Sequence, residues 1–327
     1  MSYFQINLVV AQKYYSNGKF LITGEYLVLK GAKALAVPLK FGQELEVRPK
    51  TNPDFQLRWK AFADPYGLTS CRKFWFEAIL DIESLEILES SDLQKAKTLS
   101  SLLKQAKDLN PKTLRNIDGF DVYTNAGFDI NWGLGSSSTL ISNVAKWFGI
   151  DPFQLHFNTS AGSGYDIACA NADGPVFYTL QGKRPLVETA RFNPDFSQQL
   201  YFVYLGNKQQ TNQSIRDFSG RLNNKGREIE RISEISDELT STHDLEEFEF
   251  FIEEHEQIMS AVLGVPTVKQ TTFAGFPGSV KSLGAWGGDF VMLTWQDGKK
   301  ELIGYLAKKG MKTVFGFDEI VLSNIKK

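Results

Sequence analysis

The sequence has few of the residues that build cross-linked or metal-bound proteins. Among its 327 residues are only two cysteines and three histidines. Two cysteines cannot form a framework of several disulfide bridges, so we expect a reducing compartment, the cytoplasm. His156, His243 and His255 are scattered without metal-ligand spacing, which argues against a zinc site.

Long apolar runs and an excess of one charge are also missing. No apolar stretch is long enough to span a bilayer, and the N-terminus lacks the basic and apolar regions of a signal peptide. The formal net charge is −2, without a block of Lys and Arg, which argues against nucleic acid or membrane as a partner. A composition that is 42% hydrophobic is typical of a soluble globular protein, and we expect the chain to be long enough for two domains.

The most informative feature is a glycine-serine segment, which consists of Gly133, Leu134, Gly135, Ser136, Ser137 and Ser138. It is followed at helical spacing by Leu140, Ile141, Val144, Ala145 and Phe148, and Gly149 ends the run. A glycine-rich turn before a helix presents unpaired N–H groups and the positive end of the helix dipole. The segment therefore predicts a site for an anion, most often phosphate, where a helix begins.

Other glycine motifs do not fit this segment. A Walker loop needs Gly-Lys followed by Ser or Thr, and a Rossmann fingerprint needs a third glycine where this chain has Ser138. A hydrolase elbow, Gly-x-Ser-x-Gly, is also absent. A plain surface loop is the other interpretation, so the phosphate site needs support from elsewhere in the chain.

Hydrophobic periodicity predicts a mixture of helices and strands. An apolar stripe from Leu93 to Leu109, ended by Pro111, predicts one helix, and Asp151 before Pro152 predicts the start of another. Two acidic helices are expected between about 225 and 263. Strands are expected within 19–30 and 34–47, at 120–124 and 201–205, and near 290–293.

Three further glycine-bearing segments accompany the first. They are Gly18-Lys19-Phe20-Leu21-Ile22-Thr23-Gly24-Glu25-Tyr26, Gly162-Ser163-Gly164-Tyr165-Asp166 and Lys281-Ser282-Leu283-Gly284-Ala285-Trp286-Gly287-Gly288-Asp289. Taken singly, each is a turn, and a lone Lys or Asp in a turn is more often solvated than catalytic. Together with the glycine-serine segment, they form a pattern.

In their order and separations, the four segments resemble the motifs of the GHMP kinases, the superfamily of galactokinase, homoserine kinase, mevalonate kinase and phosphomevalonate kinase. The central segment is similar to the family's Gly-Leu-Gly-Ser-Ser phosphate loop. Gly24-Glu25-Tyr26 resembles the phosphomevalonate kinase spelling, where mevalonate kinases have Gly-Glu-His. The other two segments are also similar to that branch, and the resemblance covers about Gly18 to Leu293.

The resemblance implies a two-domain α+β fold. Residues 1–190 would form the N-terminal, ATP-binding domain, similar to domain 2 of ribosomal protein S5. Residues 191–327 would form a ferredoxin-like C-terminal domain. The change of composition beyond Gly182 is the reason for placing the boundary near residue 190.

The resemblance also implies ATP and Mg²⁺ as cofactors. The six residues of the glycine-serine segment would wrap the ATP phosphates, with the Ser137 hydroxyl reaching Mg²⁺. Asp166 matches the family's catalytic aspartate and Lys19 the lysine beside it. Lys19 can stabilise an anionic oxygen and the transferred phosphoryl group, and Asp166 can accept or orient the acceptor's proton. The residues predicted on the acceptor side are Glu25, Tyr26, Ser163, Gly164, Gly284 and Ala285.

The chain departs from the family pattern in two places. Mevalonate kinases carry a magnesium-binding glutamate upstream of the catalytic aspartate, whereas residues 154–158 contain no acid here. Water and ATP oxygens would then complete the magnesium shell. Trp286 replaces a glycine, and it would either narrow the acceptor pocket or pack as an aromatic filler, which we favour.

The leading interpretation is an ATP-dependent kinase that phosphorylates phosphomevalonate in isoprenoid-precursor synthesis. The alternatives are a mevalonate kinase with a hydroxyl acceptor, an enzyme like diphosphomevalonate decarboxylase, and a nucleotide-binding homologue with degraded catalysis. We expect a monomer or homodimer with a small-molecule acceptor, and no nucleic-acid or membrane partner.

Overall fold

The computed structural model describes residues 11–50, 54–64, 72–115, 118–206, 218–284, 286 and 289–323. These residues form two compact units that alternate along the sequence. The first unit contains 11–16, 42–130 and 136–160, and the second contains 17–41, 131–135 and 161–323. The predicted domains, 1–190 and 191–327, are instead continuous in sequence, and the boundary near residue 190 stays a prediction.

The first unit is built on strands in the order β5-β4-β3-β6-β2. Their bounds are β2 Ala34–Pro49, β3 Gln56–Ala63, β4 Lys73–Asp81, β5 Ile87–Ser90 and β6 Gly119–Ala126. β3 runs parallel to β6, and the other neighbours are antiparallel. Alternate residues of β3 are buried, so one face of the sheet is apolar.

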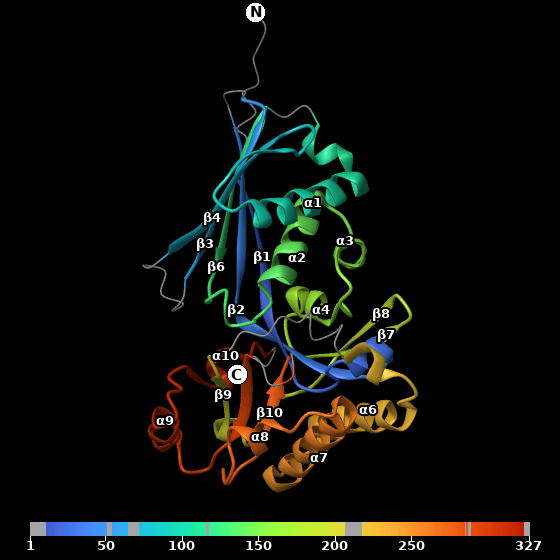
Figure 1. Cartoon of the computed structure of the whole chain (residues 1–327), viewed down its shortest axis with the longest axis vertical. Coiled ribbons are helices and arrows are strands. Elements are labelled where there is room, and N and C mark those ends of the chain that lie inside the picture. Colours follow the sequence, from blue (N-terminus) through green and yellow to red (C-terminus); the bar gives the residue numbers. More distant parts are fainter. Residues whose placement is uncertain are drawn as a thin grey trace, which may run out of the picture. The chain divides into compact units, whose positions relative to one another are not determined.

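Three helices lie on one side of β3, β4 and β6 (Figure 1). They are α1 Leu93–Leu109, α2 Ser136–Phe148 and α3 Pro152–Thr159, and each begins where the sequence predicts. Asp92 caps α1 by accepting the N–H groups of Gln94 and Lys95, and Asp151 caps α3. A short 3-10 turn, η2 Pro111–Leu114, follows α1.

A buried polar network holds α2 to the strands of its unit. Asn143 on α2 donates from Nδ2 to the carbonyl of Gln43 at 2.8 Å and accepts the Ser16 hydroxyl at 2.8 Å. Thr139 donates to Gln43 Oε1 at 2.8 Å. These side chains are at most 3% exposed. Since their polar atoms are paired with one another, burying them does not cost the free energy of unsatisfied groups.

The second unit contains part of the same sheet. The N-terminal half of β2 pairs with β7 Val176–Gln181, which pairs with β8 Arg184–Thr189. β1, Gln12–Leu21, also pairs with β2. The helix α4 Tyr165–Asn171 precedes β7, and the turn η1 Leu27–Lys30 follows β1. β1 and β2 thus contribute residues to both units.

A second, antiparallel sheet lies wholly in this unit, with the order β10-β11-β9-β12. Its strands are β9 Leu200–Tyr204, β10 Val280–Leu283, β11 Phe290–Thr294 and β12 Val314–Gly316. Val203, Val291 and Leu293 pack in one core cluster with Leu302 and Leu306 of α9. The bounds of the surrounding turns and helices are η3 Ser197–Gln199, η4 Ser219–Leu222, α8 Val268–Thr271, α9 Lys299–Ala307 and α10 Phe317–Ile320.

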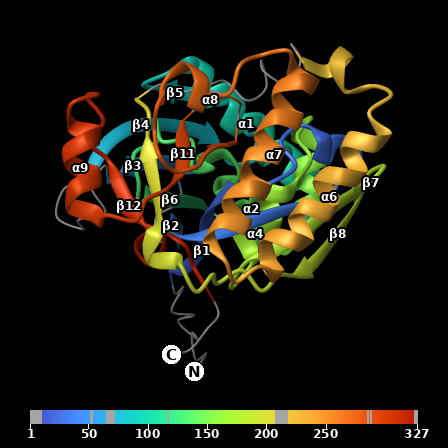
Figure 2. The ribbon, with the colours of Figure 1, turned by 90° about the horizontal axis from the view of Figure 1, so that it is seen from below.

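Two long acidic helices, α6 Gly226–Ser241 and α7 Leu245–Leu263, run side by side (Figure 2). Arg231 of α6 joins them by a bidentate pair with Glu254 of α7, with two N···O distances of 2.7 Å. A large mixed sheet and a small antiparallel sheet with these helices confirm the predicted α+β class. No helix in the described parts of the chain has the length and apolar character needed to cross a membrane.

Candidate functional site

The glycine-serine segment has the backbone geometry that its glycines permit. Gly133 and Gly135 have φ angles of 68° and 98°, in the left-handed region that favours glycine. Leu134 between them is buried, and α2 begins at Ser136. Ser137 is exposed, whereas Ser138 is buried. The predicted start of a helix is confirmed, so the glycine-serine segment leads directly into the N-terminus of α2.

Lys19 on β1 lies directly against this segment. Its ammonium Nζ donates to the carbonyl of Gly133 at 2.9 Å, and its backbone N–H donates to the carbonyl of Leu134 at 3.1 Å. Gly18 permits this approach, because a Cβ there would lie 2.9 Å from the carbonyl oxygen of Phe41. The structure thus brings together two segments that the sequence predicts to act together.

Burial and charge act in opposite directions on the Lys19 ammonium. Burial lowers the pKa of Lys19 below its ordinary value, and the nearby carboxylates of Asp166 and Asp289 raise it. Nζ also lies 5.8 Å from the centre of the Tyr165 ring, within range of a cation–π contact. Lys19 is therefore a partly desolvated cation beside two acids and an aromatic ring.

Asp166 lies in the first turn of α4, beside Tyr165. Gly164 precedes the helix with a φ of 89°, and Asp166 Oδ1 accepts the N–H of Ile167 at 3.1 Å. The Tyr178 hydroxyl donates to the carbonyl of Ser163, which fixes the turn before the helix. Burial, and next the charge of Asp166, raise the pKa of Tyr165 well above its ordinary value. Tyr165 therefore stays a neutral phenol next to the carboxylate.

Asp289 is a buried acid to which the sequence analysis assigns no role. A Cβ built on Gly133 would lie 1.8 Å from Asp289 Oδ2, so the carboxylate occupies the place of a side chain at Gly133. Asp289 also raises the pKa of Lys19. Its position at the end of a glycine run, directly before the buried strand β11, is the sequence signal that could have singled it out.

Glu25 and Tyr26, predicted on the acceptor side, are both buried. Glu25 is 1% exposed and pairs with Lys281 of β10. Tyr26 has a φ of 60°, unusual for a residue other than glycine. Its hydroxyl accepts the backbone N–H of Trp286 at 3.1 Å. The first and last glycine-bearing segments are thus joined to each other, and a direct contact of either residue with substrate stays a prediction.

Trp286 is packed into the protein. Its side chain is 6% exposed, and its indole N–H donates to the carbonyl of Pro266 at 3.2 Å. This favours the packing interpretation over a narrowed acceptor pocket. Gly284 has a φ of 77°, while Ala285 lies outside the described residues.

The described residues contain no group of three or more His, Cys, Asp and Glu side chains that could hold a metal ion. His156 and His255 are buried, and His243 is exposed beside Asp195. The completion of a magnesium shell by water and ATP oxygens stays a prediction.

Solved structures with the same fold carry three different enzyme names. The chain is similar to a mevalonate kinase from Methanococcus jannaschii, with a TM-score of 0.64, 16% identity, and 96% and 99% of the two chains covered. It is similar to a phosphomevalonate kinase from Streptococcus pneumoniae in complex with phosphomevalonate and AMPPNP, with a TM-score of 0.68, 15% identity, and 94% and 99% of the two chains covered. It is also similar to a mevalonate diphosphate decarboxylase from Staphylococcus aureus, with a TM-score of 0.55, 13% identity, and 95% and 94% of the two chains covered.

The chain has the GHMP kinase fold. No family model and no curated protein sequence matches the chain. At these identities the likeness shows the GHMP kinase fold alone, so the roles of Lys19, Asp166 and the glycine-serine segment stay predictions. The neighbours with different enzyme names show that the fold does not select the reaction.

Proposed function

We propose that the protein is an ATP-dependent kinase that transfers a phosphoryl group to phosphomevalonate. The observation that carries the proposal is the Lys19 ammonium on the carbonyl of Gly133, beside the carboxylates of Asp166 and Asp289. A cation on a glycine loop next to a helix N-terminus suits the transfer of an anionic group. The complex of a similar structure with phosphomevalonate and AMPPNP supports the same choice of ligands.

The glycine-serine segment fits the phosphates of ATP. Gly135, left-handed with a φ of 98°, has no side chain that would block an approaching phosphate, and the amides of α2 follow at once. The exposed Ser137 hydroxyl is the group we assign to Mg²⁺. When bound, Mg²⁺ neutralises charge on the phosphates. The nucleotide would be held by Ser137 together with the rest of the segment, Gly133, Leu134, Gly135, Ser136 and Ser138.

Lys19 and Asp166 would act on the acceptor and on the transferred group. Lys19 lowers the repulsion between an anionic acceptor and the incoming phosphoryl group, and its place beside two acids favours the charged ammonium. Asp166 orients the acceptor, or takes its proton if the acceptor is a hydroxyl. The acceptor side of the site would be shaped by the turn residues Ser163, Gly164 and Gly284, together with Ala285, Glu25 and Tyr26.

The proposed setting is the cytoplasm, with the chain acting as a monomer or homodimer on a small-molecule acceptor. An exposed basic block for nucleic acid is missing from the sequence. Mevalonate as acceptor, decarboxylation of diphosphomevalonate, and nucleotide binding without turnover are the alternatives that an experiment has to separate.

Incubation with Mg-ATP and single acceptors, followed by phosphorus NMR, tests the proposal. The acceptors are mevalonate, phosphomevalonate, diphosphomevalonate, homoserine and galactose, and a reaction without the protein is the background control. We expect a diphosphate product with phosphomevalonate alone. A monophosphate ester from mevalonate, or carbon dioxide and phosphate from diphosphomevalonate, would replace the proposal by that alternative. Failure of every acceptor to be phosphorylated would contradict kinase activity.

A further inference from the structure

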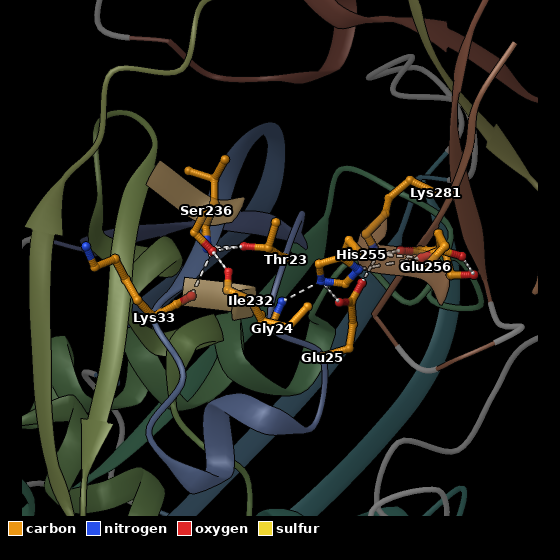
Figure 3. A network of polar contacts seen from close by, with 11 residues as sticks. Thr23, Gly24, Glu25, Lys33, Ile232, Ser236, His255, Glu256 and Lys281 are labelled. Atoms are coloured by element: carbon orange, nitrogen blue, oxygen red, sulfur yellow. Dashed lines mark hydrogen bonds and ion pairs between the residues drawn. The ribbon is translucent and has the colours of Figure 1, made fainter. Parts of the chain in front are cut away.

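Four ionisable side chains are enclosed together in the second unit (Figure 3). Glu25 comes from the segment after β1, His255 and Glu256 come from α7, and Lys281 comes from β10. They are 1%, 0%, 3% and 0% exposed, respectively. We call these four residues the buried cluster. Charged groups are almost never buried so completely unless they compensate one another.

Each member of the buried cluster contacts another. The Lys281 ammonium pairs with Glu25 and lies 3.0 Å from Glu256 Oε1. The imidazole Nε2 of His255 lies 3.2 Å from Glu25 Oε2. Glu256 Oε2 accepts the Ser282 hydroxyl at 3.1 Å. One ammonium therefore serves two carboxylates, with an imidazole beside them.

The charges of the cluster do not balance with ordinary protonation states. Two carboxylates, one ammonium and a neutral imidazole leave one uncompensated negative charge in a site without solvent access. A buried unpaired charge is strongly unfavourable, and proteins relieve it by changing a protonation state. The cluster therefore needs one additional proton, and only Glu25, Glu256 or His255 can carry it.

The hydrogen bonds decide between these carriers. His255 Nε2 accepts the backbone N–H of Gly24 at 3.1 Å, so this nitrogen carries a lone pair and not a proton. Glu256 is already paired with the ammonium and with the Ser282 hydroxyl. Glu25 Oε2 faces His255 Nε2 and accepts no hydrogen bond. Because Nε2 carries no proton, the only proton that can lie between these two atoms is one on Glu25 Oε2, which would share the lone pair with the Gly24 N–H.

We propose that the buried cluster is electrically neutral, with its additional proton on Glu25 directed at His255, and that it positions the Gly24–Tyr26 turn against β10. Glu25 is then a positioning residue and not a catalytic one. The groups that face it are Lys281 from β10, His255 and Glu256 from α7, and the Tyr165 phenol from α4.

The electrostatics of Glu25, His255 and Lys281 agree with this assignment, while burial, opposed by Lys281 and Ser282, also raises the pKa of Glu256. Burial, supported by the charge of Glu256 and opposed by Lys281, raises the pKa of Glu25 to about 7. Burial, and next the charge of Lys281, hold the pKa of His255 well below its ordinary value, so the imidazole is neutral. The two carboxylates outweigh burial at Lys281 and raise its pKa, so this side chain remains an ammonium.

The turn that the cluster holds is also fixed at its other end. The Thr23 hydroxyl lies 2.6 Å from the Ser236 hydroxyl of α6 and accepts the N–H of Leu35 at 2.8 Å (Figure 3). Tyr26, with its left-handed backbone, follows Glu25 immediately. A residue in such a conformation persists only when its surroundings enforce it, and the buried cluster supplies that constraint.

Two spectroscopic measurements on the full chain test the proton assignment without a substrate. Nitrogen NMR reports the protonation of His255, and His156→Gln and His243→Gln assign the other two imidazoles. Infrared difference spectra between the wild type and Glu25→Gln report a protonated Glu25 carboxyl. We expect a neutral His255 and a carboxylic-acid band for Glu25 at pH 6. An imidazolium at His255, or the absence of that band, would overturn the assignment.

Glu256→Gln is the matched control, because Lys281 then has one carboxylate and the cluster balances without the additional proton. The acid band of Glu25 should disappear although Glu25 is still present. Its persistence in Glu256→Gln would contradict the charge argument. The positioning role rests on the proposed function only for its effect on turnover: Glu25→Ala should lose at least tenfold more in kcat/KM than Glu25→Gln, because glutamine keeps the shape and the hydrogen bonds of a protonated Glu25. Equal losses in the two variants would overturn the positioning role and leave the spectroscopic result intact.

Discussion

At the scale of single residues, Lys281 and Lys19 differ in how their charge is compensated. Lys281 shares its ammonium between two carboxylates in a closed site. Lys19 is half-buried, contacts a carbonyl, and has its acids farther away. The first arrangement suits a structural ion pair, while the second leaves a cation able to contact an anionic ligand.

Lys19 and Asp166 should respond differently to substitution if the acceptor is a phosphate. Lys19→Ala removes the charge that offsets repulsion between donor and acceptor, and should lower kcat by about 10²–10³-fold. Asp166→Asn should cost less than this, because an ionised phosphate needs no general base. Steady-state kinetics with the authentic acceptor measure both.

Lys13→Ala on the exposed part of β1 is the control for loss of a lysine, and circular dichroism should show that all variants fold. If Asp166→Asn were far more damaging than Lys19→Ala, a hydroxyl acceptor would be indicated and the proposed substrate would be wrong.

At the scale of elements, the glycine-serine segment depends on close contacts as well as on φ angles. Asp289, directly before β11, fills the space beside Gly133, and the ammonium of Lys19 on β1 donates to the carbonyl of the same glycine. Three segments therefore constrain one another around a single residue without a side chain.

Gly133→Ala and Gly149→Ala form a matched pair. Both glycines are left-handed, with φ angles of 68° and 64°, so alanine costs about 1–2 kcal/mol of strain at either site. A Cβ at Gly149 meets nothing within 4 Å, whereas one at Gly133 collides with Asp289. Urea unfolding should show a larger loss of stability for Gly133→Ala, and Mg-ATP use should fall in that variant alone. Equal effects of both variants would mean that Asp289 moves aside freely.

The elements with strong local signals were predictable from sequence. The stripe of α1, the Asp151-Pro152 start of α3 and the beginning of α2 at Ser136 are confirmed, because caps and periodicity are local. The pair between Glu25 and Lys281 was not predictable, since 256 positions separate the partners. His255 and Glu256 on the buried face of α7 were a signal, because an apolar stripe rarely contains two ionisable residues.

At the scale of the whole molecule, the buried cluster ties stability to pH. A carboxyl whose pKa rises on folding binds its proton more tightly in the folded state, so its contribution is largest below the unfolded value and is lost as the pH rises through the folded value. For Glu25 this window runs from about 4.5 to about 7.

Glu25→Gln should remove this dependence. As the pH rises through this window, the wild type should lose about 1.4 kcal/mol of unfolding free energy per pH unit relative to Glu25→Gln. Above the window the difference between the two proteins should stay constant. Urea denaturation at several pH values measures the difference, in which the titration of groups outside the buried cluster cancels. A difference that stays constant from pH 5 to 7 would show that Glu25 keeps its ordinary pKa.

The alternation of the two units along the sequence also sets the order in which a growing chain can fold. All segments of the first unit have been synthesised once residue 160 is made, whereas residues 17–41 belong to a unit that continues to the end of the described chain. Because units tend to fold during synthesis as they become complete, the first can form while the rest is still being translated. Until residue 281 leaves the ribosome, Glu25 lacks its ammonium partner, and the buried cluster cannot yet hold the Gly24–Tyr26 turn.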